Sequence, residues 1–138
     1  PAVAFILKNT DAELVAIFEV NTLLNTRKLV YLTTRAAGID RAYNGTNVGL
    51  LTKNHNNNQD VIALMSGQIP CSAYLTPQSY IGFIYKDAGV QYMCRISVPA
   101  EPGLFIGQIS IGWKEPPANI ESAQTVLIVA SGLLFDKK

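Results

Sequence analysis

The chain has 138 residues, of which 49% are hydrophobic and 15% charged, so it is long enough to bury one core and too apolar to be disordered. Its net charge of +1 comes from 11 basic and 10 acidic residues, and the basic residues are scattered, which argues against a nucleic acid or an anionic membrane as partner. The longest apolar run, residues 126–135, has about half the length of a membrane span. We therefore expect a single domain over residues 1–138, without a membrane span.

The N-terminal part predicts the end of a helix followed by an antiparallel hairpin. Asp11 separates the helix from the first strand. Residues 14–20 are apolar on both faces of an extended chain, which is typical of a central strand. Residues 28–34 (KLVYLTT) follow a polar connection, and we expect them to form the partner strand.

The middle of the chain is its least regular part. Six asparagines lie between residues 44 and 58, and because asparagine competes with helical hydrogen bonds, we predict a surface loop there with at most one short turn. Asp60 then suits the N-cap of a short helix, VIALMS, and Gly67 suits its end. The stretch at residues 71–75 (CSAYL) fits a short strand.

Three further strands are predicted between residues 80 and 113. Residues 80–85 (YIGFIY) and 90–98 would pair around the turn KDAG. Residues 103–113 (GLFIGQISIGW) place apolar side chains on one face and a half-polar set on the other, which is typical of an antiparallel sheet covered mainly on one side. The apolar face consists of Phe105, Ile109, Ile111 and Trp113, with Gly107 leaving a gap for a packed helix.

Residues 119–135 predict a helix that is capped by Asn119. Its apolar residues recur every three or four positions and form two neighbouring stripes. One stripe is enough to dock the helix on a sheet, so the second stripe indicates another contact. This second stripe, which we predict to be a homodimer interface, consists of Val126, Val129 and Leu133.

The sequence holds no motif that identifies a reaction. Its single histidine, His55, lies among asparagines without a second metal ligand nearby. No serine stands in a G-x-S-x-G setting, and the glycines of residues 103–113 lie inside a predicted strand rather than at the strand-to-helix turn of a phosphate loop. We therefore expect no enzymatic activity, no metal and no cofactor.

Five polar residues lie where a ligand site is plausible. Arg95 and Ser97 share the less apolar face of one predicted strand. Arg35, Arg41 and Tyr43 follow another predicted strand into the loop region. We predict that these five residues bind a ligand, and an ordinary solvated or structural role is the alternative for each.

The two cysteines, Cys71 and Cys94, fit no metal-binding or redox spacing. Free cysteines are often buried, so one interpretation is a pair of buried apolar thiols. The other is one disulfide in an oxidising compartment. The sequence leaves both interpretations open.

The order of the predicted elements resembles that of the GAF family of sensory domains. The residues that carry this resemblance are CRISVPAEPGLFIGQISIGW, followed by a helix that ends in ASGLL. The family's features fall on Val98-Pro99, Pro102-Gly103, Ile106-Gly107 and the helix 119–135. The resemblance implies an α+β fold of GAF/PAS type, with a single antiparallel five- to six-stranded sheet and the terminal helices packed on one face. It further implies a non-enzymatic sensory or regulatory domain in the cytoplasm, which binds a small ligand or a partner protein.

The chain departs from the GAF pattern in its middle. The segment that usually covers a ligand is compressed here into the asparagine-rich loop and a short helix. The residues associated with cyclic-nucleotide recognition are not evident, and Cys71 lacks the neighbouring histidine typical of a chromophore-bearing cysteine. The resemblance therefore implies neither cGMP nor tetrapyrrole binding.

A narrower stretch resembles the soluble extracytoplasmic domain of T-even bacteriophage holins. It runs from SGQIPCSAY through VQYMCRISVP to FIGQISIGW and a following helix. This alternative implies a protein-binding domain that controls lysis timing, in an oxidising periplasm around Cys71 and Cys94. The membrane helix of such a holin would lie upstream of Pro1, outside this chain.

Overall fold

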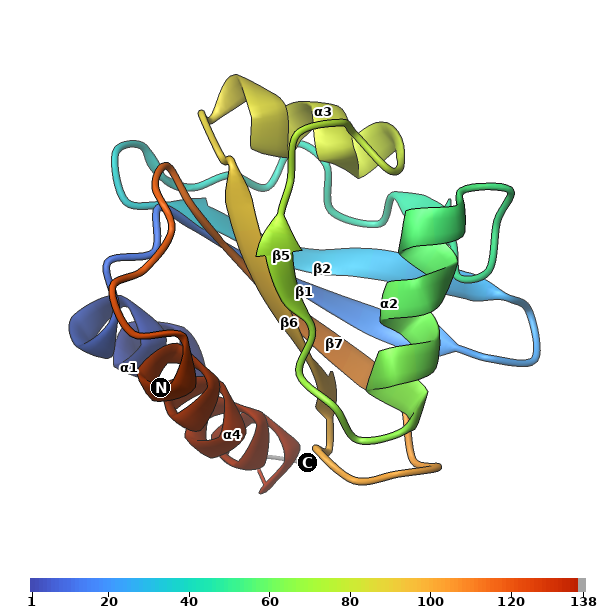
Figure 1. Ribbon diagram of the computed structural model, residues 1–138. Coiled ribbons are helices and arrows are strands. Elements are labelled where there is room, and N and C mark those ends of the chain that lie inside the picture. The colour runs from blue at the N-terminus through green and yellow to red at the C-terminus, as the bar shows by residue number, and fades with distance from the viewer. Residues whose placement is uncertain (137–138) are drawn as a thin grey trace.

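The computed structural model describes residues 1–136, and within them the chain forms four helices and seven strands (Figure 1). In chain order these are α1 (Ala2–Asn9), β1 (Leu14–Asn21), β2 (Thr26–Thr34), β3 (Gly38–Ile39), β4 (Asn47–Gly49), α2 (His55–Met65), β5 (Cys71–Ala73), α3 (Tyr80–Asp87), β6 (Tyr92–Val98), β7 (Gly107–Trp113) and α4 (Ile120–Asp136). No helix in this part of the chain is long and apolar enough to cross a membrane.

The strands form one antiparallel sheet in the order β3-β2-β1-β7-β6-β5. β4 pairs with residues 26–28 at the start of β2, on the same edge as β3 and opposite β1. β1 lies between β2 and β7, as its apolar residues on both faces predict. The predicted hairpin of β1 and β2 is confirmed, with Glu19 opposite Lys28. The fold class is therefore α+β with a single antiparallel sheet, as predicted, and its seven strands include three of only two or three residues.

The terminal helices α1 and α4 lie side by side on one face of the sheet, whereas α2 and α3 lie on the other (Figure 1). The core between the sheet and the terminal helices includes Ile6, Ile96, Ile111 and Leu127. On the opposite face, two smaller cores lie between the sheet and the helices α3 and α2. The sequence prediction of a sheet covered mainly on one side is therefore wrong, because two short helices cover the half-polar face.

Residues 80–85 form the helix α3 and not the predicted strand. A run of six residues fits the two-residue period of a strand as well as the 3.6-residue period of a helix. Here the N-terminal cap favours the helix. The Ser79 hydroxyl accepts a hydrogen bond from the Gly82 amide at 3.3 Å and so caps the first turn. The helix buries Ile81, Gly82 and Tyr85 and exposes its remaining aromatic residues to solvent.

The helix α2 begins six residues earlier than predicted. Asn54, not Asp60, is its N-cap, and its side-chain oxygen accepts a hydrogen bond from the Asn57 amide at 3.0 Å. Part of the asparagine-rich segment is therefore helical, because asparagine is itself a favourable cap. The predicted end is confirmed, since Gly67 follows the helix with a φ of 78°.

Two predictions about residues 103–113 are also corrected. The strand β7 begins only at Gly107, so Phe105 packs with Leu50 and Leu64 near α2 rather than facing the terminal helices. A Cβ atom added to Gly107 would lie 3.2 Å from the Cβ of Val98 on the neighbouring strand β6. The space at Gly107 is therefore filled from within the sheet and not by a helix.

Candidate functional site

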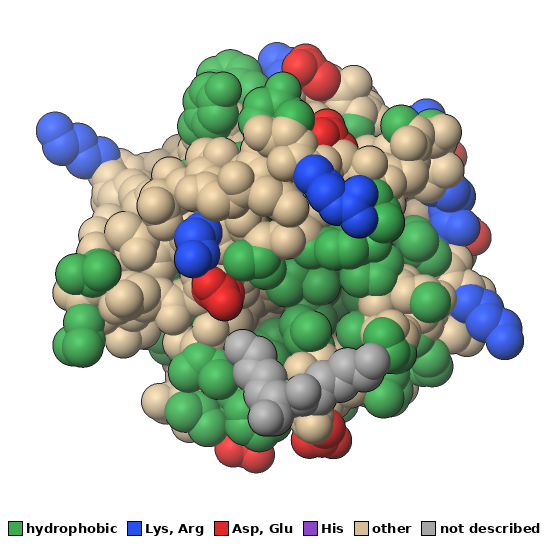
Figure 2. Space-filling view, turned by 180° about the vertical axis from the view of Figure 1, so that it is seen from behind, with side chains coloured by type: hydrophobic (Ala, Val, Ile, Leu, Met, Phe, Trp, Pro, Cys, Tyr) green, Lys and Arg blue, Asp and Glu red, His purple; other side chains and the backbone are tan. Residues whose placement is uncertain are grey.

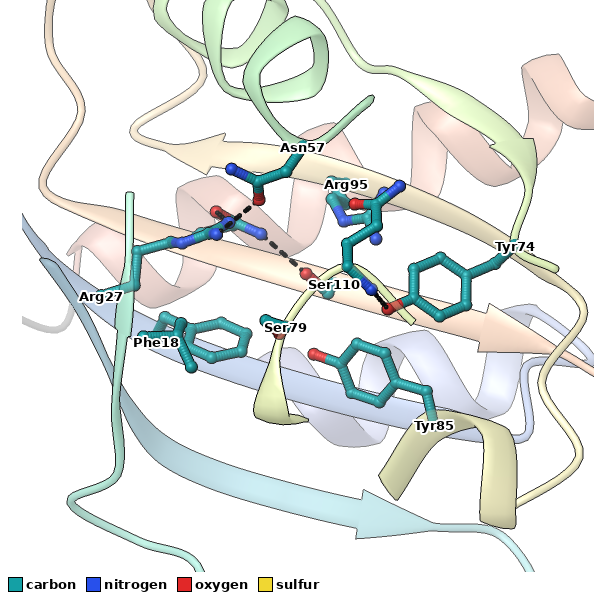
Figure 3. A pocket seen from close by; sticks show the side chains of 11 residues that line it. Phe18, Arg27, Asn57, Tyr74, Ser79, Tyr85, Arg95 and Ser110 are labelled. Atoms are coloured by element: carbon teal, nitrogen blue, oxygen red, sulfur yellow. Dashed lines mark hydrogen bonds between the residues drawn. The ribbon is translucent and has the colours of Figure 1, made fainter. Parts of the chain in front are cut away.

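The candidate site is a small polar cavity between the sheet and the helices α2 and α3 (Figure 3). Its volume is about 20 Å³. Strands β1, β2, β6 and β7 form its floor, and side chains from α2, α3 and the segment before α3 close it. The lining residues are Phe18, Arg27, Val48, Asn57, Tyr74, Gln78, Ser79, Tyr85, Arg95, Gln108 and Ser110.

Arg27 is buried at one side of this cavity, with 6% of its surface exposed. Its Nη2 atom donates to the side-chain oxygen of Asn57 at 2.7 Å and to the carbonyl of Gly49 at 2.9 Å, while Nη1 donates to Gln108 at 3.2 Å. All three acceptors are uncharged. Burial, with a smaller contribution from the nearby Arg95, lowers the pKa of Arg27 to about 10, so the guanidinium stays charged at neutral pH.

Arg95 reaches the cavity from β6 and forms the buried ion pair of the site. Its Nη1 atom lies 2.8 Å from a carboxylate oxygen of Asp60 on α2, and the two side chains are 7% and 17% exposed. The guanidinium carbon lies 5.5 Å from the ring centroid of Tyr74, within the range of a cation–π contact. This pair ties α2 to the sheet.

Two tyrosines close the side of the cavity opposite Arg27 (Figure 3). The rings of Tyr74 and Tyr85 meet edge to face with centroids 5.8 Å apart. The Tyr74 hydroxyl accepts a hydrogen bond from the Gln78 amide at 2.9 Å, and a Cβ atom at Gly82 would collide with this hydroxyl. Burial raises the pKa of both hydroxyl groups, which therefore stay protonated and able to donate.

The cavity carries a surplus of positive charge. Arg27 and Arg95 contribute two positive charges, and Asp60 neutralises one of them. Within residues 1–136, no other acidic side chain forms an ion pair with either arginine. An environment of this kind favours an anion or the negative end of a dipole.

Of the five predicted ligand-binding residues, the structure places only Arg95 on the cavity. Ser97 lies two residues further along β6, where its hydroxyl donates to the Pro99 carbonyl at 2.9 Å. Arg35 donates to the carbonyls of Leu7, Thr10 and Ala12 and so holds the end of α1. Arg41 is exposed, and Tyr43 is half-buried beside the α3 core. The five residues are therefore not brought together.

The residues that sequence reasoning missed are Arg27, Asn57, Gln108 and Ser110. A signal for two of them was present, because Gln108 and Ser110 alternate on the half-polar face of β7. The sequence predicts a partly solvated face here, whereas both side chains are 1% exposed and Gln108 donates a hydrogen bond to Ser110 at 2.9 Å. Arg27 lies in the predicted connection before residues 28–34, and Asn57 lies in the predicted asparagine-rich loop, where polar residues are ordinary.

The predicted second stripe of α4 is only partly free. Val126 packs in the core against the sheet with 9% of its surface exposed, so it is not available to a second chain. Val129 and Leu133 are 42% and 37% exposed. Ile128, which was not in the predicted stripe, is 52% exposed and lies beside them on α4.

Cys71 and Cys94 are paired in a disulfide between the edge strand β5 and its neighbour β6. The two residues lie directly opposite each other, with Cα atoms 4.1 Å apart. Among residues 1–136, no three His, Cys, Asp or Glu side chains are grouped in a way that could hold a metal ion. His55 is the exposed first residue of α2.

No family model matches the sequence, and no curated protein matches it either. Solved structures do. A GAF domain of a two-component sensor histidine kinase from Bacillus halodurans superposes with a TM-score of 0.69 at 13% identity, over 97% of this chain and 86% of that one. The GAF domain of an Acinetobacter phosphoenolpyruvate-protein phosphotransferase gives a TM-score of 0.61 at 14% identity, over 97% of this chain and 73% of that one.

The chromophore-binding domain of a bacteriophytochrome from R. palustris is also similar, with a TM-score of 0.67 at 10% identity. The match covers 99% of this chain and 51% of that structure, so the chain spans about half of it. The chain therefore has the GAF fold that its sequence resembles. At these identities the likeness shows the fold alone.

We predict that Tyr85→Phe flattens the loss of stability at alkaline pH. Burial raises the pKa of the Tyr85 hydroxyl above its ordinary value of 10.0, so the folded chain keeps this proton after the unfolded chain has lost it. The resulting stabilisation is complete below pH 10 and is lost as the pH rises further, by up to about 1.4 kcal/mol per pH unit. In urea unfolding followed by circular dichroism from about pH 9 to about pH 11, the variant should lose less stability than the wild type.

Tyr80→Phe is the matched control, because Tyr80 lies on the same helix and is 64% exposed. Its unfolding free energy should run parallel to that of the wild type. The lowered pKa of Arg27 acts in the opposite direction at high pH, but it is shared by all three proteins and cancels in the comparison. Parallel curves for Tyr85→Phe and the wild type would contradict the buried, protonated state of this hydroxyl.

Proposed function

We propose that the chain is a non-enzymatic sensory or regulatory domain that binds a small ligand in the polar cavity and transmits its occupancy to the terminal helices. The observation that carries this proposal is the pair of buried arginines, Arg27 and Arg95, that line one cavity, although only Arg95 has a carboxylate partner, Asp60. The likeness to a GAF domain of a sensor histidine kinase supports it. Burying uncompensated charge is costly, and such groups concentrate at functional sites.

The strand β6 provides a physical connection between the cavity and the terminal helices. Arg95 points from β6 into the cavity, whereas the neighbouring Cys94 and Ile96 pack towards α1 and α4. The Ser131 hydroxyl of α4 donates to the Ser97 carbonyl of β6 at 2.8 Å. Because Ser97 lies opposite Gln108, which binds Arg27, a displacement of the arginines reaches α4 through a single pair of strands.

The exposed side of α4 is the part of the chain that we propose as a homodimer interface. Ile128, Val129 and Leu133 lie there, and a Cβ atom at Gly132 would meet nothing within 4 Å, so a second helix can approach closely. Exposed hydrophobic side chains also occur outside α4, for example Leu23 and Leu75. Seen from behind, hydrophobic side chains gather over the centre and the lower part of the surface (Figure 2). Pairing through α4 would give ligand binding an output, because α4 also contacts β6.

Ligand binding can be tested with ¹⁵N-labelled protein and a panel of small carboxylates, phosphates, amines and heterocycles. We predict that at least one compound shifts amide resonances at the cavity, such as that of Gln108, together with resonances of α4, such as that of Ser131. Ser110→Val should abolish both sets of shifts, because the larger apolar side chain fills the cavity and removes the hydroxyl that Gln108 binds.

The matched control is Ser72→Val, which makes the same change at an exposed position on the edge strand β5. This variant should bind as the wild type does. A panel without any cavity binder, or a binder that leaves the α4 resonances in place, would contradict the proposed sensory role.

We predict that Leu133→Glu weakens self-association and leaves the fold intact. Burying a leucine fully contributes about 1.5–3 kcal/mol, and part of this is available because Leu133 is 37% exposed. The dissociation constant from sedimentation equilibrium should rise by at least about tenfold. Leu23→Glu is the matched control, because Leu23 is 96% exposed and lies outside α4. A wild type that stays monomeric at high concentration, or an equal effect of Leu23→Glu, would refute this interface.

A second candidate function is that of an extracytoplasmic protein-binding domain, as the resemblance to T-even holins implies. The Cys71–Cys94 disulfide favours it, since disulfides persist mainly in oxidising compartments. The likeness to solved GAF domains gives no support to the holin resemblance. On this hypothesis the exposed side chains of α4 would bind a different protein rather than a second copy.

The disulfide can be tested by thiol labelling. If the domain functions in an oxidising compartment, protein purified from such a compartment and unfolded in denaturant should show no reactive thiol before reduction and two after it. Two thiols that react before reduction would argue against this second candidate. They would leave the ligand-binding proposal untouched, because neither cysteine lines the cavity.

A further inference from the structure

One side-chain group at the cavity lacks a partner. The Nε–H group of Arg27 has no hydrogen-bond acceptor anywhere in residues 1–136, although its atom is buried. The two Nη atoms of the same guanidinium are held by Asn57, Gly49 and Gln108. A buried, charged donor that is left unpaired costs more than a neutral one, so an acceptor with negative charge is the expected partner.

The other polar groups around the cavity favour the same kind of ligand. Tyr85 and Ser110 place hydroxyl groups towards its centre, and both can donate (Figure 3). The only carboxylate paired with a cavity arginine among the described residues is that of Asp60, which Arg95 engages at 2.8 Å. One additional negative charge would therefore make the cluster neutral, whereas a doubly charged anion would exceed this balance.

The size of the cavity limits the ligand further. Its volume of about 20 Å³ is larger than the roughly 10–15 Å³ that a single water requires. A single-atom ion or a group of very few atoms fits without a rearrangement of Gln78 and Ser79, the two lining residues that precede α3. Larger carboxylates would have to displace this segment.

We propose that the cavity is a binding site for one small monovalent anion, which accepts a hydrogen bond from the Nε–H group of Arg27 and is attracted by the charge of Arg95, which lines the same cavity. The anion would be a halide or a one-carbon carboxylate such as formate, which share charge, acceptor chemistry and approximate size. This inference deepens the proposed ligand-binding function and rests on the same cavity. It assigns the unused donor of Arg27 as the group that recognises the ligand.

The direct test follows the Nε–Hε resonance of Arg27 in ¹H–¹⁵N spectra of the wild-type protein. Sodium chloride and sodium formate are titrated separately at constant ionic strength, with sodium gluconate, a carboxylate too large for the cavity, as the balancing salt. We expect a saturable shift of this resonance with chloride, with formate or with both. The salt whose titration saturates at the lower concentration contains the preferred anion. A resonance that does not move with either salt overturns the proposal.

The second test measures thermal unfolding in the same salts. A ligand that binds only the folded chain raises the melting temperature in a saturable manner. Arg27→Gln should lose this rise, whereas Arg41→Gln, which removes an exposed arginine outside the cavity, should keep it. An equal rise in gluconate, or an unchanged rise in Arg27→Gln, overturns the proposal. If Arg27→Gln does not fold, the titration of the Arg27 Nε–Hε resonance in the wild-type protein shows whether the anion binds.

The outcomes separate this inference from the proposed function. A neutral compound that shifts both the cavity and the α4 resonances, with no effect of chloride or formate, would refute the anion site and leave the sensory function standing. An anion that binds at Arg27 without moving the α4 resonances would establish the site and refute the transmission to the terminal helices.

Discussion

The arrangement of the molecule depends on two arginines that are buried on the face of the sheet opposite the terminal helices. Arg27 on β2 and Arg95 on β6 stand on strands separated by β1 and β7, so three strand spacings, about 14 Å, lie between their backbones. Both side chains are about as buried as core residues, and each needs a polar partner there. The helix α2 supplies both, because Asn57 and Asp60 are three residues apart and share one helix face. These contacts hold α2 over the sheet together with the apolar packing of Val61 and Leu64.

The sequence predicts the regular elements well, since their hydrophobic period is long enough to be unambiguous. The apolar recurrence in α4 extends over four turns, and β1, β6 and β7 each alternate or stay apolar over seven or eight residues. Residues 80–85 are too short for this, and their helix depends on the cap at Ser79 and on packing against Tyr74. The buried polar residues around the cavity could not be predicted either, and the reason is different. Gln108, Ser110 and Arg27 look like surface residues until α2 and α3 cover them, and only tertiary structure provides that cover.

The sheet separates two regions of different chemical character that share the same strands. On the side of α1 and α4, the core is apolar and contains the buried Trp113. On the other side, polar side chains interrupt the core and enclose the cavity. Successive residues of a strand point to opposite faces. Arg95 and Ile96 therefore belong to different regions, although they are neighbours in the chain. Any shift of β6 that accommodates a ligand at Arg95 therefore changes the surface on which α4 rests, without a separate relay of residues.

An unpartnered buried N–H group does not by itself mark a binding site in this protein, since the indole nitrogen of Trp113 also has no partner within residues 1–136. The two groups differ in charge and in surroundings. The indole is neutral and lies at the end of β7 on the apolar side, so its cost is that of one unmade hydrogen bond. The guanidinium of Arg27 is charged, donates only to uncharged acceptors and lines the same cavity as a second arginine. If the cluster served only to position α2, an apolar contact would do so at lower cost, because replacing buried charges with hydrophobic residues is often neutral or stabilising. The proposed anion would balance the positive charge that Asp60 leaves over, whereas the packing of α2 on the sheet does not require this charge.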